Sequence, residues 1–285
     1  MITLKPAVVR GAPRSLLGEG PVWEHVSGTL YWVDIDSAML HAYSPGSSNV
    51  GSFSLEESAS CIALCADGRL LLALRNTLAL FNPRNHELER VKAVEIGDQA
   101  RFNDGKCDVV GRFWVGTMDI EEERPIGALY VVEAGFRVRR ILGGVTVSNG
   151  IGWSPDYTRM YYVDSPTRRV SVFGYDKERG EISGLLRSID LSSQPGVPDG
   201  LTVDSEGGLW VALWEGSSVL RIDPASSEAT ARVELPVPRV TSCTFGGENL
   251  DTLYITTAQN KQGVGGEVYT IKTHTHGSPT NVFKP

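Results

Sequence analysis

The chain has 285 residues, of which 41% are hydrophobic and 21% charged, as is ordinary for a globular protein. Its formal net charge is −7, and Lys and Arg are spread along the sequence, so no basic stripe indicates a nucleic-acid partner. No apolar run is long enough to span a bilayer, and the start lacks the apolar stretch of a signal peptide. We therefore expect one cytoplasmic domain over residues 1–285, with no membrane contact and no obligate protein partner.

A unit that consists of a polar turn followed by several short strands repeats six times along the chain. Its most regular part is a strand rich in β-branched and aromatic residues that follows a polar turn, predicted over residues 29–33, 69–73, 112–116, 159–163, 208–212 and 252–256. A third strand is expected over 39–43, 78–81, 128–132, 169–175, 219–222 and 267–271, and an outer strand over 51–55, 88–94, 136–142, 185–189 and 231–235. Four strands repeating about every 45 residues are typical of a propeller blade. The sequence therefore predicts an all-β, six-bladed β-propeller with four-stranded antiparallel blades around a central channel.

The sixth unit lacks an evident outer strand. Residues 7–9 form a spare strand near the start, and residues 281–283 form a short apolar tail near the end. An open edge in the ring would expose unpaired backbone groups, so one or both of these segments should complete the last blade.

The four cysteines are too few for a disulfide framework, so we expect Cys61, Cys65, Cys107 and Cys243 to be buried free thiols.

Polar residues recur at one position relative to the regular strands. Glu19 lies 10 residues before residue 29, Asn103 lies 9 before residue 112, Asn149 lies 10 before residue 159, and Asp199 lies 9 before residue 208. The same position holds Ser60 and Ser242 in the other two units. The first strand of each blade lines the channel, so these residues should meet at one end of the axis. Two carboxylates and two amides suit a hard or borderline divalent cation.

Each of these residues also has a purely local interpretation. Glu19, Asn149 and Asp199 each precede a glycine, and such dipeptides are common in turns. Turns have no reason to recur at one offset from a strand, so the shared position favours the metal site.

Five segments make the whole chain resemble the senescence marker protein, gluconolactonase and regucalcin family. They span residues 17–23, 101–106, 116–118, 148–151 and 198–201. The resemblance implies a six-bladed propeller that hydrolyses sugar lactones. It also implies one divalent cation held by Glu19, Asn149 and Asp199, with substrate contacts from Arg101, Asn103 and Glu121. The cation is expected to be Ca²⁺ or Zn²⁺, while Mn²⁺, Mg²⁺ and Fe²⁺ remain open.

We hypothesise that the cation polarises the lactone carbonyl as a Lewis acid. Asp199 would act as general base toward water or carry a metal-bound hydroxide. Arg101 and Asn103 would orient the sugar, although Arg101 could instead pair with Asp104 or Asp119.

The sequence has no motif for a serine esterase, a zinc protease or a phosphate-binding loop. The alternatives are a calcium-binding regulator and a phosphotriesterase or arylesterase; a scaffold of the WD type is disfavoured because its signature dipeptides are absent.

Overall fold

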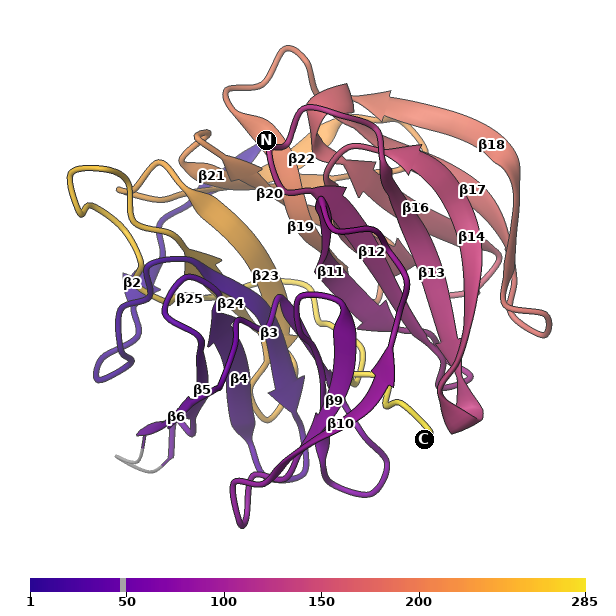
Figure 1. Ribbon diagram of the computed structural model, residues 1–285. Helices are drawn as coiled ribbons and strands as arrows, with labels where there is room; N and C mark the ends of the chain where they lie inside the picture. Colours follow the sequence, from indigo (N-terminus) through magenta and orange to yellow (C-terminus); the bar gives the residue numbers. More distant parts are fainter. Residues whose placement is uncertain (47–49) are drawn as a thin grey trace.

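The strands of the computed structural model, which describes residues 1–46 and 50–285, form six sheets arranged in a ring (Figure 1). Blade 1 contains β3 (Gly18–Glu24), β4 (Thr29–Asp34), β5 (Met39–Tyr43) and β6 (Val50–Ser54). Blade 2 contains β7 (Cys61–Leu64), β8 (Leu70–Ala73), β9 (Thr77–Phe81) and β10 (Leu88–Ala93). Blade 3 contains β11 (Ala100–Cys107), β12 (Phe113–Asp119), β13 (Gly127–Glu133) and β14 (Arg137–Val145).

The second half of the ring continues this pattern. Blade 4 contains β15 (Ser148–Trp153), β16 (Arg159–Asp164), β17 (Arg169–Asp176) and β18 (Glu181–Asp190). Blade 5 contains β19 (Val197–Val203), β20 (Leu209–Trp214), β21 (Ser218–Ile222) and β22 (Ala229–Glu234), and blade 6 contains β23 (Val240–Gly246), β24 (Thr252–Thr257) and β25 (Tyr269–Lys272). These six blades confirm the predicted propeller. The helices of the described residues are two short 3₁₀ turns, η1 (Ala134–Phe136) and η2 (Ser165–Thr167), and neither could cross a membrane.

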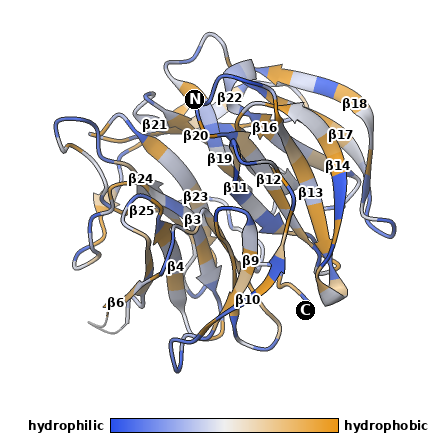
Figure 2. Ribbon diagram, in the orientation of Figure 1, coloured by the Kyte–Doolittle hydropathy of each residue, from blue (hydrophilic) through white to orange (hydrophobic). Residues whose placement is uncertain are grey.

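The core is divided among the blade interfaces. The described residues form six hydrophobic clusters, one between each pair of neighbouring blades. Side chains alternate between the two faces of a strand, so each middle strand supplies apolar residues to the clusters on both sides of its blade. Figure 2 shows apolar residues along strands such as β13, β16 and β17, with hydrophilic residues in the outer loops. A single blade could not bury both faces, and the ring solves this by stacking. All four cysteines are buried and free, as predicted.

Two short strands near the N-terminus complete blades 5 and 6. β2 (Ala7–Val8) pairs antiparallel with β25 and becomes the outer strand of blade 6, while β1 (Ile2–Leu4) pairs parallel with β22 as a fifth strand of blade 5. Of the two segments that the sequence offered for completing the last blade, the one over residues 7–9 therefore supplies the outer strand. β1 was not predicted, because three residues beside a parallel partner carry no periodic signal of their own.

The tail forms a strap across one end of the propeller. It runs from blade 5 through blades 6, 1 and 2 to blade 3 and ends near β10 in Figure 1. His276 O accepts from Ser205 N at 2.7 Å, Thr280 Oγ1 donates to Trp23 O at 2.8 Å, and Lys284 N donates to Gly111 O at 3.0 Å. Phe283 is fully buried in the cluster between blades 2 and 3. The tail therefore crosses one end of the propeller and contacts five blades, and it does not add a strand to blade 6.

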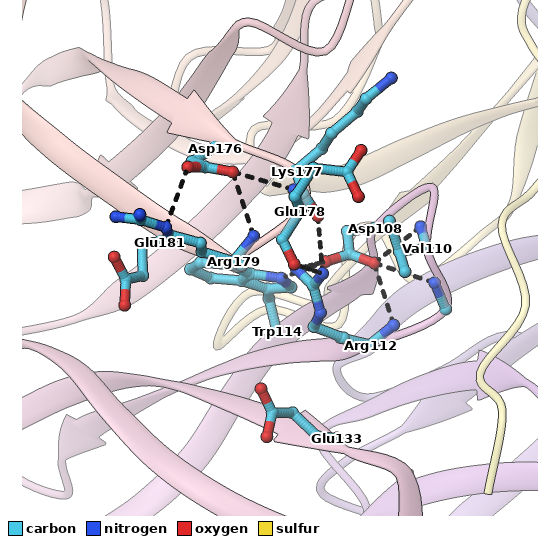
Figure 3. Close-up of polar contacts among 12 residues, drawn as sticks. Asp108, Val110, Arg112, Trp114, Glu133, Asp176, Lys177, Glu178, Arg179 and Glu181 are labelled. Carbon is cyan, nitrogen blue, oxygen red and sulfur yellow. Dashed lines mark hydrogen bonds and ion pairs between the residues drawn. The ribbon is translucent and has the colours of Figure 1, made fainter.

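A buried carboxylate joins blade 3 to blade 4 (Figure 3). Asp108 accepts hydrogen bonds from the Trp114 indole at 3.0 Å, the Tyr175 hydroxyl at 2.8 Å and the Arg112 guanidinium at 3.2 Å. Arg112 also donates to the carbonyl of Lys177 at 2.6 Å. The network supplies the hydrogen bonds that a fully buried carboxylate needs.

Candidate functional site

The innermost strands of five blades carry β-bulges. The register shifts lie between Glu19 and Val22, between Phe102 and Gly105, between Asn149 and Ile151, between Pro198 and Leu201, and between Val240 and Ser242. A bulge adds an unpaired residue and turns its side chain away from the regular pleat. The glycine dipeptides that resemble turns therefore lie inside strands, and their interpretation as turns is wrong.

Glycines beside these polar residues permit the close approach of the inner strands. Gly20 has a positive φ of 54°, a conformation that favours glycine. A Cβ atom on Gly200 would lie 2.2 Å from the hydroxyl of Ser242 in blade 6. The recurring glycine after the polar residue is thus needed for backbone geometry and for packing between blades.

The polar side chains meet in a cavity of about 190 Å³ at one end of the channel. Its lining consists of Leu17, Glu19, Ile35, Arg101, Asn103, Met118, Glu122, Val147, Asn149, Ser165, Pro166, Val197, Asp199 and Trp214. The structure thus brings together the predicted metal-binding and substrate-binding residues except Glu121, and the functional roles of all of them stay predictions. Ser60 and Ser242 lie outside this lining.

Glu122, and not Glu121, belongs to the lining of this cavity. The turn after β12 places Glu122 at a positive φ of 62°, and its backbone N–H donates to Asp119 O at 3.0 Å. Arg124 holds the same turn through an ion pair of 2.7 Å with Asp119. Two adjacent glutamates in a tight turn point in different directions, and the sequence alone does not indicate which one faces the cavity. Asp119 is thereby paired with Arg124, whereas the Arg101 guanidinium donates to Asn103.

A relay of hydrogen bonds links three blades at the cavity. The Arg101 guanidinium donates to Asn103 Oδ1 at 2.8 Å, and Asn103 Nδ2 donates to Asn149 Oδ1 at 3.1 Å. Asn149 Nδ2 then donates to Ser165 Oγ at 2.9 Å, and Ser165 Oγ donates to Pro198 O at 2.7 Å. Each amide is held in one orientation, and each amide oxygen keeps a second lone pair for another partner.

The cavity concentrates negative charge. Burial, together with the charge of Asp104, raises the pKa of Glu19 to about 8. Burial and the nearby Glu19 raise the pKa of Asp199 well above its ordinary range. Burial lowers the pKa of the Arg101 guanidinium, while the surrounding carboxylates oppose that change. Two buried carboxylates without a full set of donors are neutralised either by protons or by a bound cation.

These residues fit a divalent cation. Glu19, Asn149 and Asp199 offer two carboxylates and an amide oxygen from three blades, the oxygen donors that hard cations prefer. Within the described residues, no three Asp, Glu, His or Cys side chains gather at a metal-binding spacing.

A second cavity, of about 120 Å³, also lies along the channel, and the strap closes it with Ser278, Pro279, Thr280 and Asn281. Its walls include Asp104 and Lys106, and burial raises the pKa of the Asp104 carboxyl and lowers that of the Lys106 ammonium. Neither residue was predicted to line the channel. Their positions one and three residues beyond Asn103, on a strand that lines the axis, were the available signal.

The fold and this cavity define the class of protein: a six-bladed β-propeller with an oxygen-rich site at one end of its channel. Residues 17–259 match the family model described as SMP-30/Gluconolactonase/LRE-like region, so the chain belongs to that family.

Relatives across this family resemble the whole chain. "Putative sugar lactone lactonase YvrE" of Bacillus subtilis (strain 168) is 36% identical over 88% of this chain and 87% of its own length. Regucalcin of Xenopus laevis is 36% identical, with 90% of each chain covered. The crystal structure of a calcium-binding protein, regucalcin, from Agrobacterium tumefaciens str. C58 has a TM-score of 0.92 and 26% identity, with 100% of both chains covered. Family membership therefore supports sugar lactone hydrolysis in general.

Proposed function

We propose that the chain hydrolyses a sugar lactone, such as gluconolactone, to the corresponding aldonic acid in a metal-dependent reaction. The observation that carries the proposal is the meeting of Glu19, Asn149 and Asp199 with Arg101 in one cavity. Glu19, Asn149 and Asp199 would hold one divalent cation, with Ca²⁺ and Zn²⁺ as the first candidates. When bound, the cation supplies Lewis-acid polarisation of an ester carbonyl.

Asp199 is the proposed general base. It would take a proton from a water molecule as the water oxygen forms a bond to the lactone carbonyl carbon. The ring C–O bond then breaks, and the proton passes to the ring oxygen, which becomes a hydroxyl of the aldonic acid. Burial raises the pKa of Asp199 in the metal-free chain, and a bound cation would lower it and so keep the carboxylate ionised and able to accept a proton.

Arg101 and Asn103 would orient the substrate. The Arg101 guanidinium donates to Asn103 Oδ1 and to Phe102 O, so its position is fixed before a ligand arrives. Its remaining N–H groups can donate to sugar hydroxyls or to the ring ester. Arg101→Ala should therefore raise KM more than it lowers kcat.

The decisive experiment measures acid release from a panel of aldonolactones after chelation and restoration of each metal ion. Turnover should return with at least one divalent cation and should fall in Asp199→Asn by at least about 10², the lower range for general-base catalysis. Asp98→Asn, at an exposed position, is the matched control. Near-normal turnover in Asp199→Asn would refute the base assignment, and no turnover with any cation would refute the lactonase.

The same experiment separates the alternatives. A calcium-binding regulator would bind the cation without turning over any lactone. A phosphotriesterase or arylesterase would hydrolyse aryl esters or phosphotriesters faster than sugar lactones.

The four buried, free thiols suit a reducing compartment, and we propose the cytoplasm as the location. A small-molecule lactone is the proposed partner, without nucleic acid, membrane or obligate protein.

A further inference from the structure

Several residues that line the cavity are apolar, and they come from the same blades as the proposed metal ligands. Val197 and Trp214 come from blade 5, Ile35 follows β4 of blade 1, and Val147 and Pro166 belong to blade 4. A fully polar ligand would gain nothing from such walls. The cavity therefore suits a ligand with one polar edge and one face of C–H groups.

Trp214 differs from the other tryptophans of the chain. Trp23, Trp32, Trp114, Trp153 and Trp210 are between 0% and 7% exposed and belong to the hydrophobic clusters. Trp214 is only partly buried and lines the cavity. Its strand partner is Val197, two residues before Asp199, and Trp214 and Asp199 both line this cavity.

The Trp214 ring is held in place by a cation. The guanidinium carbon of Arg239 lies 4.8 Å from the ring centroid. Arg239 is itself fixed, because it forms an ion pair of 2.7 Å with Glu215 and donates to Gln259 O at 2.9 Å. A partly exposed aromatic side chain that is fixed from one side has little entropy to lose when a ligand stacks on it.

We propose that Trp214, clamped by Arg239, is the platform on which the substrate ring stacks, and that it sets the specificity for ring lactones with one continuous C–H face. The negative face of the indole attracts C–H hydrogens that adjacent hydroxyls have made electropositive. The hydroxyls on the opposite edge of the ring would then reach Arg101 and Glu122. This inference rests on the proposed function, because it assumes that the lactone occupies this cavity.

The test compares Trp214→Ala, Trp214→Phe and Arg239→Ala with the unaltered protein on gluconolactone, with the restored cation. Trp214→Ala should raise KM about tenfold with kcat within about twofold, which corresponds to the loss of one aromatic contact. Trp214→Phe should keep most of the affinity, and Arg239→Ala should fall between the two. A purely structural role would lower kcat or the folded fraction without separating KM from kcat.

A non-hydrolysable probe keeps this test independent of turnover. Binding of gluconolactam, the ring amide, is followed by calorimetry and by indole fluorescence. Binding that weakens about tenfold in Trp214→Ala supports the platform even if no lactone is hydrolysed, and that pattern would refute the proposed function alone. Equal binding and equal KM in Trp214→Ala would overturn the platform. If Trp214→Ala fails to fold, unchanged KM and unchanged lactam binding in Arg239→Ala would overturn it instead, because that variant removes the guanidinium that clamps the Trp214 ring.

Discussion

The Lys106 ammonium donates a hydrogen bond of 2.6 Å to Leu201 O. Lys106 belongs to blade 3 and Leu201 to blade 5, so this side chain reaches past the inner strand of blade 4. Blade 4 has Gly150 and Gly152 at this level, and a Cβ atom on either would come within 2.9 Å of the Leu201 side chain. The Lys106 ammonium therefore ties together two inner strands that are not neighbours in the ring, at the wall of the second cavity.

We predict that Lys106→Met separates fold stability from cation affinity. Loss of the bond leaves a buried carbonyl without its donor, so the free energy of unfolding should fall by about 1–3 kcal/mol. Removal of a positive charge beside Asp104 should at the same time make Ca²⁺ binding tighter. Urea denaturation and titration calorimetry measure the two effects, with Lys92→Met at an exposed position as control. Weaker Ca²⁺ binding in Lys106→Met would contradict the electrostatic argument.

The second prediction concerns the two adjacent glutamates of the turn after β12. Glu122 lines the cavity and Glu121 does not. Glu122→Gln should raise KM for the preferred lactone about tenfold, because a charge-assisted hydrogen bond is lost, while Glu121→Gln should resemble the unaltered protein. Steady-state kinetics on both variants provide a matched comparison at neighbouring positions. The opposite ranking would return the substrate contact to Glu121.

The metal-free protein should lose stability as the pH rises. The pKa of Glu19 is raised from 4.5 to about 8 in the folded chain, so between these values the folded state binds more protons than the unfolded state. The free energy of unfolding therefore decreases with rising pH over that interval, and the raised pKa of Asp199 acts in the same direction. Thermal unfolding in chelator across this range should show the decline.

Two variants check that pH dependence. Glu19→Gln should flatten the decline, because the amide does not titrate, whereas Glu95→Gln at an exposed position should leave it unchanged. Added divalent cation should restore stability most strongly at the high-pH end, where protons no longer neutralise the carboxylates. A metal-free protein that becomes more stable throughout this interval would show that these carboxylates are not buried as described.

The strap should contribute strongly to the stability of the ring. Phe283 is fully buried between blades 2 and 3 and contacts Phe136 with ring centroids 5.6 Å apart. Phe283→Ala should lower the free energy of unfolding by about 3–5 kcal/mol, as for other large core side chains. Lys284→Ala, whose side chain is exposed, serves as control in urea denaturation. Equal stability of both variants would mean that the strap is only loosely attached.

Local patterns in the sequence were sufficient to predict the architecture of the blades. Alternation along a strand and turn residues act over a few positions, so the regular strands and their spacing could be recognised one unit at a time. The same counting located Glu19, Asn103, Asn149 and Asp199, because residues at one offset in each unit fall at one end of the axis. These four residues line one cavity in the structure.

By itself, then, the sequence determined the six blades and the polar residues within four of their inner strands, since both depend on short-range periodicity. Only the tertiary structure decided which glutamate lines the cavity, that Lys106 reaches Leu201, that Trp214 lines the same cavity as Asp199, and that the tail becomes a strap. Those features depend on turn conformation and on contacts between residues far apart in the chain. Such contacts are selected by the packing of the whole ring and leave no periodic trace in the sequence.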